Sequence, residues 1–423
     1  MKILIIGSGG REHAIAMALS KSPNQNQLYA LPGNPGIEEY CECIEIDVSD
    51  FEGIKNFAKS NKIQLVIVGP EVPICDGISD YLKEHRVDVF APSQEASKLE
   101  SSKKFTKEIA FENNIPTGRA RWFNKITDAS EYLNKIEAPY VIKADGLAAG
   151  KGVAICENLK DANLSLKDIF NGKFGSGQSV LIEEFLYGEE LSYFAITDGR
   201  EILPLIGAQD HKRLLDKDEG PNTGGMGAYC PPPILSSKLE GKIMNEILEP
   251  TMYGLRKRGV EYKGVLFAGL MVNENKPSLI EYNVRFGDPE TQALLMLMKS
   301  DFTELLQETV NGNIKNYNLE WQKKRAITVV LANEGYPYQY NKDAEIYGIN
   351  DAETNPNVKV FHAGTSMMNG TLVATGGRVL NVTSVAETLD LARERAYSAI
   401  EKISYKGKVY RNDIAWRALG KNT

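Results

Sequence analysis

The chain is short of cysteine, of long apolar runs and of clustered positive charge, and each shortage excludes a class of protein. Its 423 residues include five cysteines. An odd number, no Cys-x-x-Cys pair and a long chain argue against both a disulfide framework and a metal set of cysteines. No apolar run is long enough to span a bilayer. We therefore expect reduced thiols in a cytoplasmic protein without a membrane partner.

The charge balance is acidic, with a formal net charge of −7 and basic residues scattered along the chain. This argues against a nucleic-acid or anionic-membrane surface, although a local basic pocket can still hold anionic ligands. The composition, 42% hydrophobic and 25% charged, is typical of globular proteins. A chain of this length is too long for one ordinary core, so we expect two to four compact units.

The first hundred residues alternate short apolar strands with helices. This alternation predicts a parallel, doubly wound sheet of the Rossmann-like kind. We expect strands at 3–6, 28–31, 44–46, 65–68 and 87–90, and helices at 11–19, 51–60 and 78–84.

The rest of the chain changes style twice. Short strands separated by glycine-rich connections fill the middle, followed by a hairpin whose turn is Glu274-Asn275-Lys276-Pro277. From Arg325, alternating strands and an amphipathic helix predict a small α+β unit. The expected elements are a helix at 101–114, strands at 140–143, 153–156, 180–184, 265–273 and 279–285, a buried helix at 291–298, strands at 326–332, 358–361 and 378–382, and a helix at 384–403.

The first glycine motif is Gly7-Ser8-Gly9-Gly10-Arg11-Glu12-His13, at a strand-to-helix turn. Backbone N–H groups and the helix dipole make such a turn a natural phosphate site. A plain structural turn is an equally good interpretation. A dinucleotide fingerprint is disfavoured, because Glu12 replaces its third glycine and no acidic residue closes the second strand.

A more specific motif runs from Lys143 to Val153, with the sequence KADGLAAGKGV. A strand that ends in lysine enters a loop with three glycines and a second lysine, which suits phosphate oxygens. It does not match a Walker A loop. A solvated hairpin with incidental lysines is the alternative, and it is weakened because Lys143 ends an apolar strand, where lysine is costly.

The third motif is the strand with the sequence LIEYNVR, from Leu279 to Arg285. Alternation places Glu281, Asn283 and Arg285 on one face, with Ile280, Tyr282 and Val284 toward a core. A carboxylate and an amide oxygen spaced this way suit Mg²⁺, and an arginine beside them can hold a phosphate. Alone, the motif also fits a half-exposed strand with a Glu–Arg pair.

Together these motifs predict a metal–ATP site between two β structures. Here the sequence resembles the ATP-grasp superfamily and, along essentially its whole length, the phosphoribosylamine–glycine ligase family. The resemblance lies in Gly7–His13, Pro32–Gly36, Gly69–Glu71, Lys103–Lys107, Lys143–Val153, Glu183–Glu190, Gln209–Arg213, Pro221–Gly227, Glu281–Glu290, Gly335–Pro337, His362–Thr365 and Gly376–Leu380. The Gln209–Arg213 and Pro221–Gly227 blocks are the most specific of these.

The resemblance implies three domains: an N-terminal Rossmann-like domain at 1–102, an ATP-grasp domain at 103–325 with a small mobile lid at about 120–188, and a C-terminal α+β domain at 326–423. It implies an ATP-dependent ligase of purine synthesis that activates glycine as an acyl phosphate, which the amine of 5-phosphoribosylamine then attacks. We expect a monomer or a weak homodimer. Ala415 stands where we expect glycine in this family.

The resemblance also assigns residues to ATP and metal. Glu281 and Asn283 would bind Mg²⁺ or Mn²⁺, with Arg285 beside the transferred phosphate and Lys143 also catalytic. The expected ATP-binding residues are Lys103, Lys143, Gly146, Gly150, Lys151, Gly152, Glu183, Glu184, Phe185, Leu186 and Glu190.

The remaining assignments concern the two other substrates. Amides of Gly9–Glu12 would hold the sugar phosphate, Glu71 would lie near the sugar, and Asp210 would bind the glycine ammonium group and act in catalysis. Without the resemblance, Asp210 and its neighbours read as a solvated charged loop. The expected substrate-binding residues are Gly9, Gly10, Arg11, Glu12, Asn34, Pro35, Gly36, Glu71, Asp210, Lys212, Gly224 and Arg285.

Three other functions compete with this prediction. A carboxylase of the ATP-grasp superfamily acting on another purine intermediate is disfavoured by the Gln209–Arg213 and Pro221–Gly227 blocks. A regulatory nucleotide-binding protein is disfavoured by intact Lys143, Glu281 and Arg285. An NAD-dependent dehydrogenase is disfavoured by Glu12 and the missing ribose acid.

Overall fold

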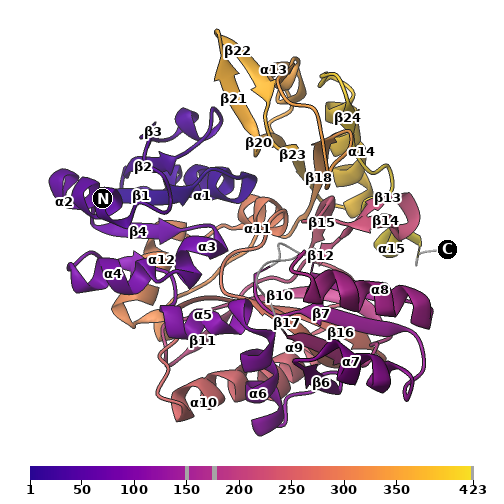
Figure 1. The fold of residues 1–423 in the computed structure, drawn as a ribbon. Helices are drawn as coiled ribbons and strands as arrows, with labels where there is room; N and C mark the ends of the chain where they lie inside the picture. Colours follow the sequence, from indigo (N-terminus) through magenta and orange to yellow (C-terminus); the bar gives the residue numbers. More distant parts are fainter. Residues whose placement is uncertain (148–151, 174–178, 421–423) are drawn as a thin grey trace.

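The computed structural model describes residues 1–147, 152–173 and 179–420. Figure 1 shows an N-terminal lobe in indigo, a C-terminal lobe in yellow, and the middle of the chain joining them. The helices α11 (Glu290–Leu297) and α1 (Gly10–Ser20) pack together where these parts meet. Among the described residues, no helix is long and apolar enough to cross a membrane.

The N-terminal lobe is built on a five-stranded parallel sheet in the order β3-β2-β1-β4-β5. Its central strands are continuous apolar runs because helices cover both faces. The third strand was predicted at 44–46 and begins two residues earlier, at Glu42. The strands are β1 (Lys2–Gly7), β2 (Gln27–Pro32), β3 (Glu42–Cys43), β4 (Leu65–Val68) and β5 (Val89–Phe90), and the helices after α1 are α2 (Phe51–Asn61), α3 (Glu71–Cys75) and α4 (Ile78–Glu84).

Two helices occupy the region where one was predicted from 101 to 114. They are α5 (Gln94–Ser101) and α6 (Lys103–Glu112). Ser102 separates them with an extended backbone, φ −131°, and its hydroxyl accepts a hydrogen bond from the Phe105 amide at 3.2 Å. Ser102 is therefore the N-cap of a second helix. The apolar periodicity, which is the same for both helices, does not reveal this break.

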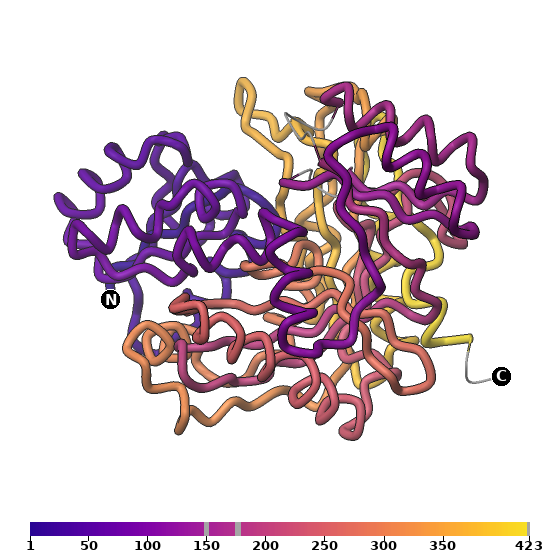
Figure 2. Tube along the Cα trace, turned by 60° about the horizontal axis from the view of Figure 1, so that its bottom comes forward, coloured from indigo at the N-terminus to yellow at the C-terminus, as the bar shows by residue number. Residues whose placement is uncertain are grey.

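The middle of the chain holds two four-stranded antiparallel sheets. One, which we call the lid unit (residues 120–183), packs two helices on its sheet and has a core of its own; Figure 2 shows it on the side away from the N-terminal lobe. Its order is β6-β9-β7-β8, formed by β6 (Ala120–Phe123), β7 (Tyr140–Ala144), β8 (Val153–Cys156) and β9 (Val180–Glu183) with α7 (Ile126–Leu133) and α8 (Leu159–Phe170).

The second sheet of the pair has the order β11-β10-β16-β17. Helices between β15 and β16 pack on it, and α12 follows α11 beneath the N-terminal lobe. Its strands are β10 (Glu189–Thr197), β11 (Ile202–Pro204), β16 (Gly264–Asn273) and β17 (Lys276–Asn283), and the helices are α9 (Ser237–Ile243), the π-helical turn Met244–Leu248, α10 (Glu249–Lys257) and α12 (Phe302–Asn311).

The β16–β17 hairpin corrects two details of the prediction. Its turn consists of Glu274 and Asn275, both with positive φ (48° and 60°), as a two-residue turn requires. A register shift opposite Gly269/Leu270 leaves Ile280 as an extra residue between Leu279 and Glu281. Ile280 is therefore only half-buried, whereas Leu279 and Tyr282 are buried on the core side.

A third sheet joins the middle of the chain to its end. Its order is β12-β15-β18-β23-β20, with β24 also paired to β18. Strands from both sides of the predicted boundary at 325 therefore share one sheet. They are β12 (Gln209–Asp210), β15 (Gly227–Cys230), β18 (Arg325–Asn333), β20 (Val358–His362), β23 (Arg378–Ala386) and β24 (Lys408–Val409).

The predicted helix at 384–403 begins too early. β23 continues to Ala386, and Thr383 and Ser384 are fully buried in the sheet, so α14 spans only Leu389–Ile400. Smaller elements complete this lobe: β13 (Arg213–Leu215), β14 (Glu219–Asn222), β19 (Ala344–Glu345), β21 (Thr365–Met368), β22 (Thr371–Ala374), α13 (Ile349–Ala352) and α15 (Trp416–Leu419).

Candidate active site

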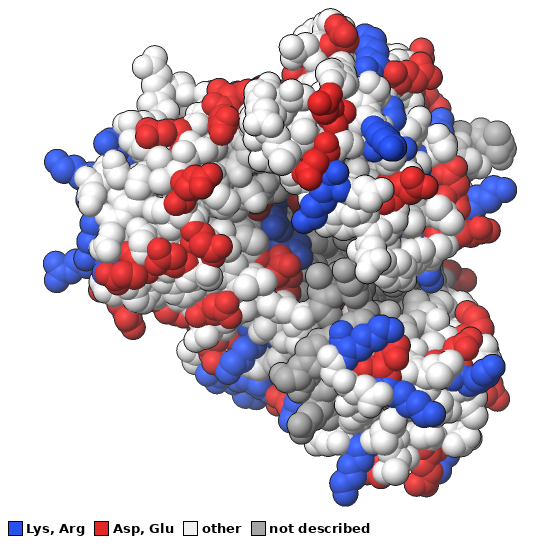
Figure 3. Space-filling model, turned by 45° about the horizontal axis from the view of Figure 1, so that its top comes forward, with Lys and Arg blue, Asp and Glu red and all other residues white. Residues whose placement is uncertain are grey.

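The Glu281 carboxylate on β17 lies at the centre of a cluster of cations. Burial alone would raise the pKa of Glu281, but the fields of Lys212, Lys143, Lys103 and Arg285 outweigh it and lower the pKa. Lys212 Nζ lies 4.0 Å from Glu281 Oε1. Figure 3 shows acidic and basic side chains gathered in the hollow at the centre of one face. The predicted lysines and the predicted metal-binding carboxylate are thus brought together by elements far apart in sequence.

Lys143 is held by a carboxylate whose side chain the sequence did not single out. Its Nζ lies 2.6 Å from Glu183 Oε2, and Lys107 bonds the other oxygen of the same carboxylate. All three side chains are at most 6% exposed. Burial lowers the pKa of Lys107 to about 8, with Glu183 opposing the shift. Glu183, expected among the ATP-binding residues, thus has a buried ionic role in the structure.

The glycine-rich loop begins beside Lys103. The Lys103 amide donates to Asp145 Oδ1 at 2.9 Å, and its ammonium group donates to the Gly146 carbonyl at 3.0 Å. Gly146 has φ +97° and open space where a Cβ would stand. The buried Gly152 carbonyl accepts from the Ala144 amide. Gly150 and Lys151 lie outside the described residues.

The segment after β9 connects the two central sheets, because β9 and β10 belong to different ones. Glu184 is exposed and pairs with Arg119 at 3.0 Å, while Phe185 and Leu186 are half-buried. Glu190, the second residue of β10, pairs with Lys212 at 2.8 Å. Burial alone would lower the pKa of Lys212, but the charges of Glu190 and Glu281 outweigh it and raise that pKa.

Arg285 lies beyond the end of β17, which stops at Asn283, whereas the prediction extended the strand to Arg285. Its guanidinium is 3.3 Å from Glu71 and 3.0 Å from Glu100, two carboxylates of the N-terminal lobe. The contact with Glu71 is made by Arg285 Nε, a buried atom that makes an ion pair there but no well-aligned hydrogen bond with any described residue. The structure therefore brings Glu71 and Arg285 together and adds Glu100 to them.

Asp210 at the end of β12 is half-buried as a residue, and one oxygen of its carboxylate is buried and unused. Its Oδ1 has no hydrogen-bond partner in the described part of the chain. Burial and then the charge of Glu290 raise its pKa well above the ordinary value, with Lys212 opposing. Burial also raises the pKa of Glu290, whose Oε1 accepts from the Ser192 hydroxyl at 3.0 Å. Such an arrangement favours a cation, because a positive group would relieve both buried carboxylates.

The first glycine turn is already filled by protein carboxylates. The Gly9 amide donates to Glu12 Oε2 at 2.6 Å, and Arg11 Nε donates to Glu12 Oε1 at 2.7 Å. A Cβ on Gly10 would lie 2.3 Å from Asn381 Nδ2. The expected cradle of free amides from Gly9 to Glu12 is therefore partly wrong, since the Gly9 amide is used and Gly10, Arg11 and Glu12 are buried.

The loop that follows β2 is also engaged within the protein. The Asn34 side chain accepts from the amides of Gly36 and Ile37 and donates to the carbonyls of Ser8 and His362. Gly36 packs on the rings of His13 and His362, while Pro35 is half-buried. Asn34 thus shapes this rim, and its side chain has no capacity left for a ligand.

A turn between β17 and α11, Phe286–Glu290, connects the three lobes. Arg11 Nη1 donates to the Phe286 carbonyl at 2.8 Å, and Arg378 Nη1 donates to the Asp288 carbonyl at 2.7 Å. The Asp288 carboxylate accepts from Gln292 at 2.9 Å. We had assigned no role to Asp288, Glu290 or Arg378. Their presence within blocks shared with the resembled family was the only signal in the sequence.

The donor set at Glu281 and Asn283 suits a hard divalent cation. Glu281 is held ionised by its cationic surroundings, and Asn283 follows it on the same face of the strand. One carboxylate and one amide oxygen leave room for phosphate oxygens and water in an octahedral shell. Elsewhere in the described ranges, no group of three or more His, Cys, Asp or Glu residues is placed to hold a metal.

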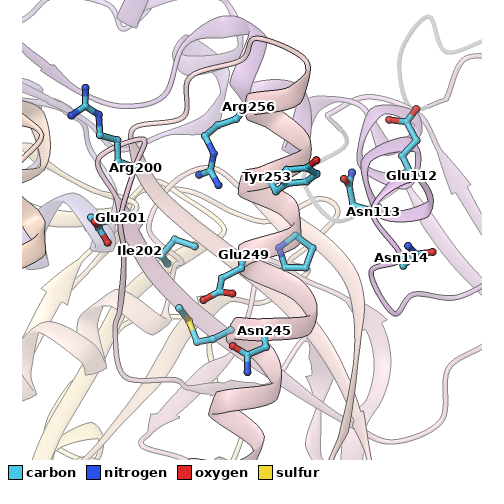
Figure 4. Close-up of a pocket in the computed structure, with 12 residues that line it drawn as sticks. Glu112, Asn113, Asn114, Arg200, Glu201, Ile202, Asn245, Glu249, Tyr253 and Arg256 are labelled. Atoms are coloured by element: carbon cyan, nitrogen blue, oxygen red, sulfur yellow. The ribbon is translucent and has the colours of Figure 1, made fainter.

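A separate surface groove of about 690 Å³ lies between the end of α6, the β10–β11 turn and α10 (Figure 4). Arg200 and Arg256 line it together with Glu112, Glu201 and Glu249. None of the predicted site residues line this groove, so the predicted chemistry belongs to the cation cluster around Glu281.

Comparison with known proteins matches the chain in three consecutive segments. Residues 1–100, 101–291 and 326–417 match the N, ATP-grasp (A) and C domains of the phosphoribosylglycinamide synthetase family. The phosphoribosylamine–glycine ligase of Rhizobium meliloti is 47% identical, with 100% of both chains covered. The chloroplastic phosphoribosylamine–glycine ligase of Arabidopsis thaliana is 46% identical, with 97% of this chain and 79% of the relative covered.

Solved structures show the same likeness at the level of the fold. The crystal structure of phosphoribosylamine–glycine ligase from Thermotoga maritima has a TM-score of 0.85 and 35% identity, covering 98% of this chain and 100% of that one. The biotin carboxylase domain of 2-oxoglutarate carboxylase from Hydrogenobacter thermophilus has a TM-score of 0.74 at 15% identity, covering 97% and 91%. The second likeness concerns the fold alone.

Proposed function

The chain belongs to the phosphoribosylglycinamide synthetase family, and on that basis we propose that it is the ATP-dependent ligase that joins glycine to 5-phosphoribosylamine, forming glycinamide ribonucleotide, ADP and phosphate in purine biosynthesis. The observation that carries this proposal is local. An ionised Glu281 surrounded by four cations lies beside a second site, the buried carboxylates of Asp210 and Glu290. One site suits a metal-bound polyphosphate and the other suits an ammonium group.

ATP is proposed to lie between the lid unit and the β10–β17 sheet. Lys103 and Lys143 neutralise phosphate oxygens, while the loop that begins at Asp145 supplies backbone amides. Because Glu183 holds Lys143 in place, the lysine is positioned before ATP arrives. Glu190 is proposed to accept hydrogen bonds from the ribose hydroxyls, which requires exchange of its pairing with Lys212.

Glu281 and Asn283 are the residues proposed to hold Mg²⁺ or Mn²⁺. When bound there, the ion neutralises charge on the polyphosphate and aligns it for transfer. Arg285, which Glu71 and Glu100 hold in position, is proposed to stabilise the transferred phosphoryl group. Phosphoryl transfer of this kind depends on positioning and charge more than on an acid–base pair.

Asp210 is proposed to bind the ammonium group of glycine through Oδ1, its oxygen without a partner. That contact places the glycine carboxylate toward the cations, where it accepts the phosphoryl group of ATP and becomes an acyl phosphate. The amine of phosphoribosylamine then attacks the carbonyl carbon and phosphate leaves. The sugar phosphate is proposed to lie between Ser8, the Pro35 rim and the Glu71–Arg285 pair. The protein is proposed to act as a monomer or weak homodimer in a reducing, cytoplasmic setting that suits its free thiols.

The test is ADP release from purified protein with Mg-ATP and phosphoribosylamine generated in situ. Glycine is compared with alanine, serine and bicarbonate. ADP formed only with glycine, and only when the amine is present, supports the ligase and both substrates. ADP formed with another carboxyl donor would keep the ATP chemistry and overturn the substrate assignment. No ADP in folded protein that binds ATP would favour a regulatory protein.

A further inference from the structure

The C-terminal lobe holds a turn of the central region from two sides. Arg378, the first residue of β23, donates from Nη1 to the Gly224 carbonyl at 2.6 Å and to the Asp288 carbonyl at 2.7 Å. The hydroxyl of Tyr336 accepts from the Gly224 amide at 3.0 Å. Both peptide groups that flank the Gly224 α-carbon are therefore fixed by side chains more than a hundred residues away in sequence.

The held turn lies directly against Asp210. A Cβ built on Gly225 would stand 2.9 Å from Asp210 Oδ1 and 2.5 Å from Pro289 Cδ, and the backbone there has φ +108°. Asp210 Oδ1 is also the buried oxygen without a partner among the described residues. The position of the Gly224–Gly225 turn thus sets the free space beside that oxygen.

The side chain of Arg378 bonds across to the central region, whereas the ring of Tyr336 is held within its own lobe. Among the described residues, the Arg378 side chain donates to the Gly224–Gly225 turn and to Asp288, and to no acceptor in the C-terminal lobe. The Tyr336 ring packs on Gly377, where a Cβ would stand 2.3 Å from Tyr336 Cδ2. This contact explains the second glycine of the Gly376-Gly377 pair and directs the hydroxyl of Tyr336 toward Gly224.

From these contacts we infer that Arg378 and Tyr336 are positioning residues that set the size of the amino-acid pocket beside Asp210. They hold the turn close enough to admit an amino acid without a side chain and to exclude one with a methyl group. The inference rests on the proposed function, because it requires that Asp210 bind the substrate's ammonium group. It assigns to the C-terminal lobe a part in choosing the carboxyl donor.

The experiment compares Arg378→Met, Arg378→Lys and Tyr336→Phe with the wild type. The rate of ADP release is measured as a function of glycine concentration and of alanine concentration, at saturating Mg-ATP and amine. The KM for ATP is measured in parallel. Arg378→Met removes hydrogen bonds from a charged donor, so we expect the KM for glycine to rise about tenfold or more and the KM for ATP to stay within about twofold. The ratio of kcat/KM for glycine over alanine falls by at least about tenfold.

The conservative variants separate positioning from folding. Arg378→Lys keeps one donor group and recovers part of the glycine KM, and Tyr336→Phe keeps the ring on Gly377 while losing one hydrogen bond, so it raises the glycine KM by only about threefold. Arg395→Met is the matched control, because Arg395 donates to a backbone carbonyl, that of Val385, remote from Asp210. It lowers thermal stability without changing the glycine KM.

Two results would overturn the inference while leaving the proposed function intact. In the first, the wild type uses glycine, but the variants keep the wild-type ratio of kcat/KM for glycine over alanine. The other is a parallel rise in the KM values for glycine and ATP, which indicates general damage. A wild type with no glycine-dependent ADP release would overturn both.

Discussion

Lys107 gives the sharpest test of the electrostatics, because it is a buried lysine that the structure places in a defined ionic network. Its ammonium group bonds the Glu183 carboxylate and the Thr117 hydroxyl, and its side chain is 4% exposed. Burial lowers its pKa from 10.5 to about 8. The perturbation is Lys107→Met, which keeps the length of the side chain and removes its titration.

The sign follows from the protons bound in each state. Between about pH 8 and pH 10.5 the unfolded chain holds a proton on Lys107 that the folded protein has released, so the free energy of unfolding rises with pH in this window. The cost of burying the charged lysine is complete below about pH 8 and is relieved as the pH approaches 10. Integrating the two titrations between pH 8 and pH 10 gives a gain of ~2 kcal/mol for wild type relative to Lys107→Met.

The assay follows urea unfolding of the lid unit through Trp122, which lies on β6 opposite Leu181 of β9. Replacing Trp321 and Trp416 by phenylalanine leaves Trp122 as the sole tryptophan. The free energy of unfolding is measured at several pH values for both proteins, and their difference is plotted against pH. Lys104→Met is the matched control, since Lys104 is on the same helix but 61% exposed.

The reasoning is refuted by a difference between wild type and Lys107→Met that stays flat from pH 8 to pH 10. A difference that moves in the opposite direction would show that Lys107 binds its proton more tightly in the folded protein, so that Glu183 outweighs burial. An equal pH dependence in the Lys104→Met control would show that the effect does not belong to the buried network.

Three further predictions concern the site and its support. Glu281→Gln abolishes ADP formation with an unchanged circular dichroism spectrum, because a neutral amide holds a divalent cation poorly; near-normal turnover would remove the metal assignment. Asp210→Asn raises the KM for glycine by about tenfold or more without changing that for ATP, and an unchanged glycine KM would exclude the ammonium contact. Ala415 is fully buried and has φ +71°. Ala415→Gly changes the free energy of unfolding by less than about 1 kcal/mol, because relief of backbone strain is offset by the lost methyl group and the freer unfolded chain, whereas Ala415→Val lowers it by more than about 2 kcal/mol. Thermal unfolding compares the two variants, and equal stabilities would contradict this account.

The elements that were predicted best are those in which local sequence and tertiary environment agree. β4 at Leu65–Val68 and α4 at Ile78–Glu84 have the expected bounds, because a strand covered on both faces is a continuous apolar run and ends at its Gly-Pro turn. Lys143 was recognisable for the complementary reason: a lysine within a buried strand needs a partner, and Glu183 provides it.

The errors arose where one residue changed a periodic pattern. The bulge at Ile280 reverses the alternation of β17, so that Leu279 and Tyr282 both face the core although they are an odd number of positions apart, with two residues between them. Simple alternation cannot show such a shift, because nothing in the local composition marks the extra residue. At the end of β23, buried Ser384 resembles the start of a helix, since serine favours caps and turns.

The contacts between lobes could not be predicted from local patterns at all. Arg378 reaches Asp288 across 90 residues, and Arg285 reaches Glu71 and Glu100 across roughly two hundred. The Gly9 amide illustrates the same limit on a smaller scale. Its turn has the geometry of a phosphate site, but Glu12 supplies the anion from within the chain.

The sheet shared by β15 and β18 has a consequence for synthesis on the ribosome. β15 ends at Cys230 and pairs on one side with β18, which begins at Arg325. The nascent chain must therefore grow by roughly a hundred residues before that edge is covered, a delay on the order of 5–20 s at typical rates of translation. During this interval an apolar strand presents unpaired backbone groups, a surface that invites pairing with another nascent chain.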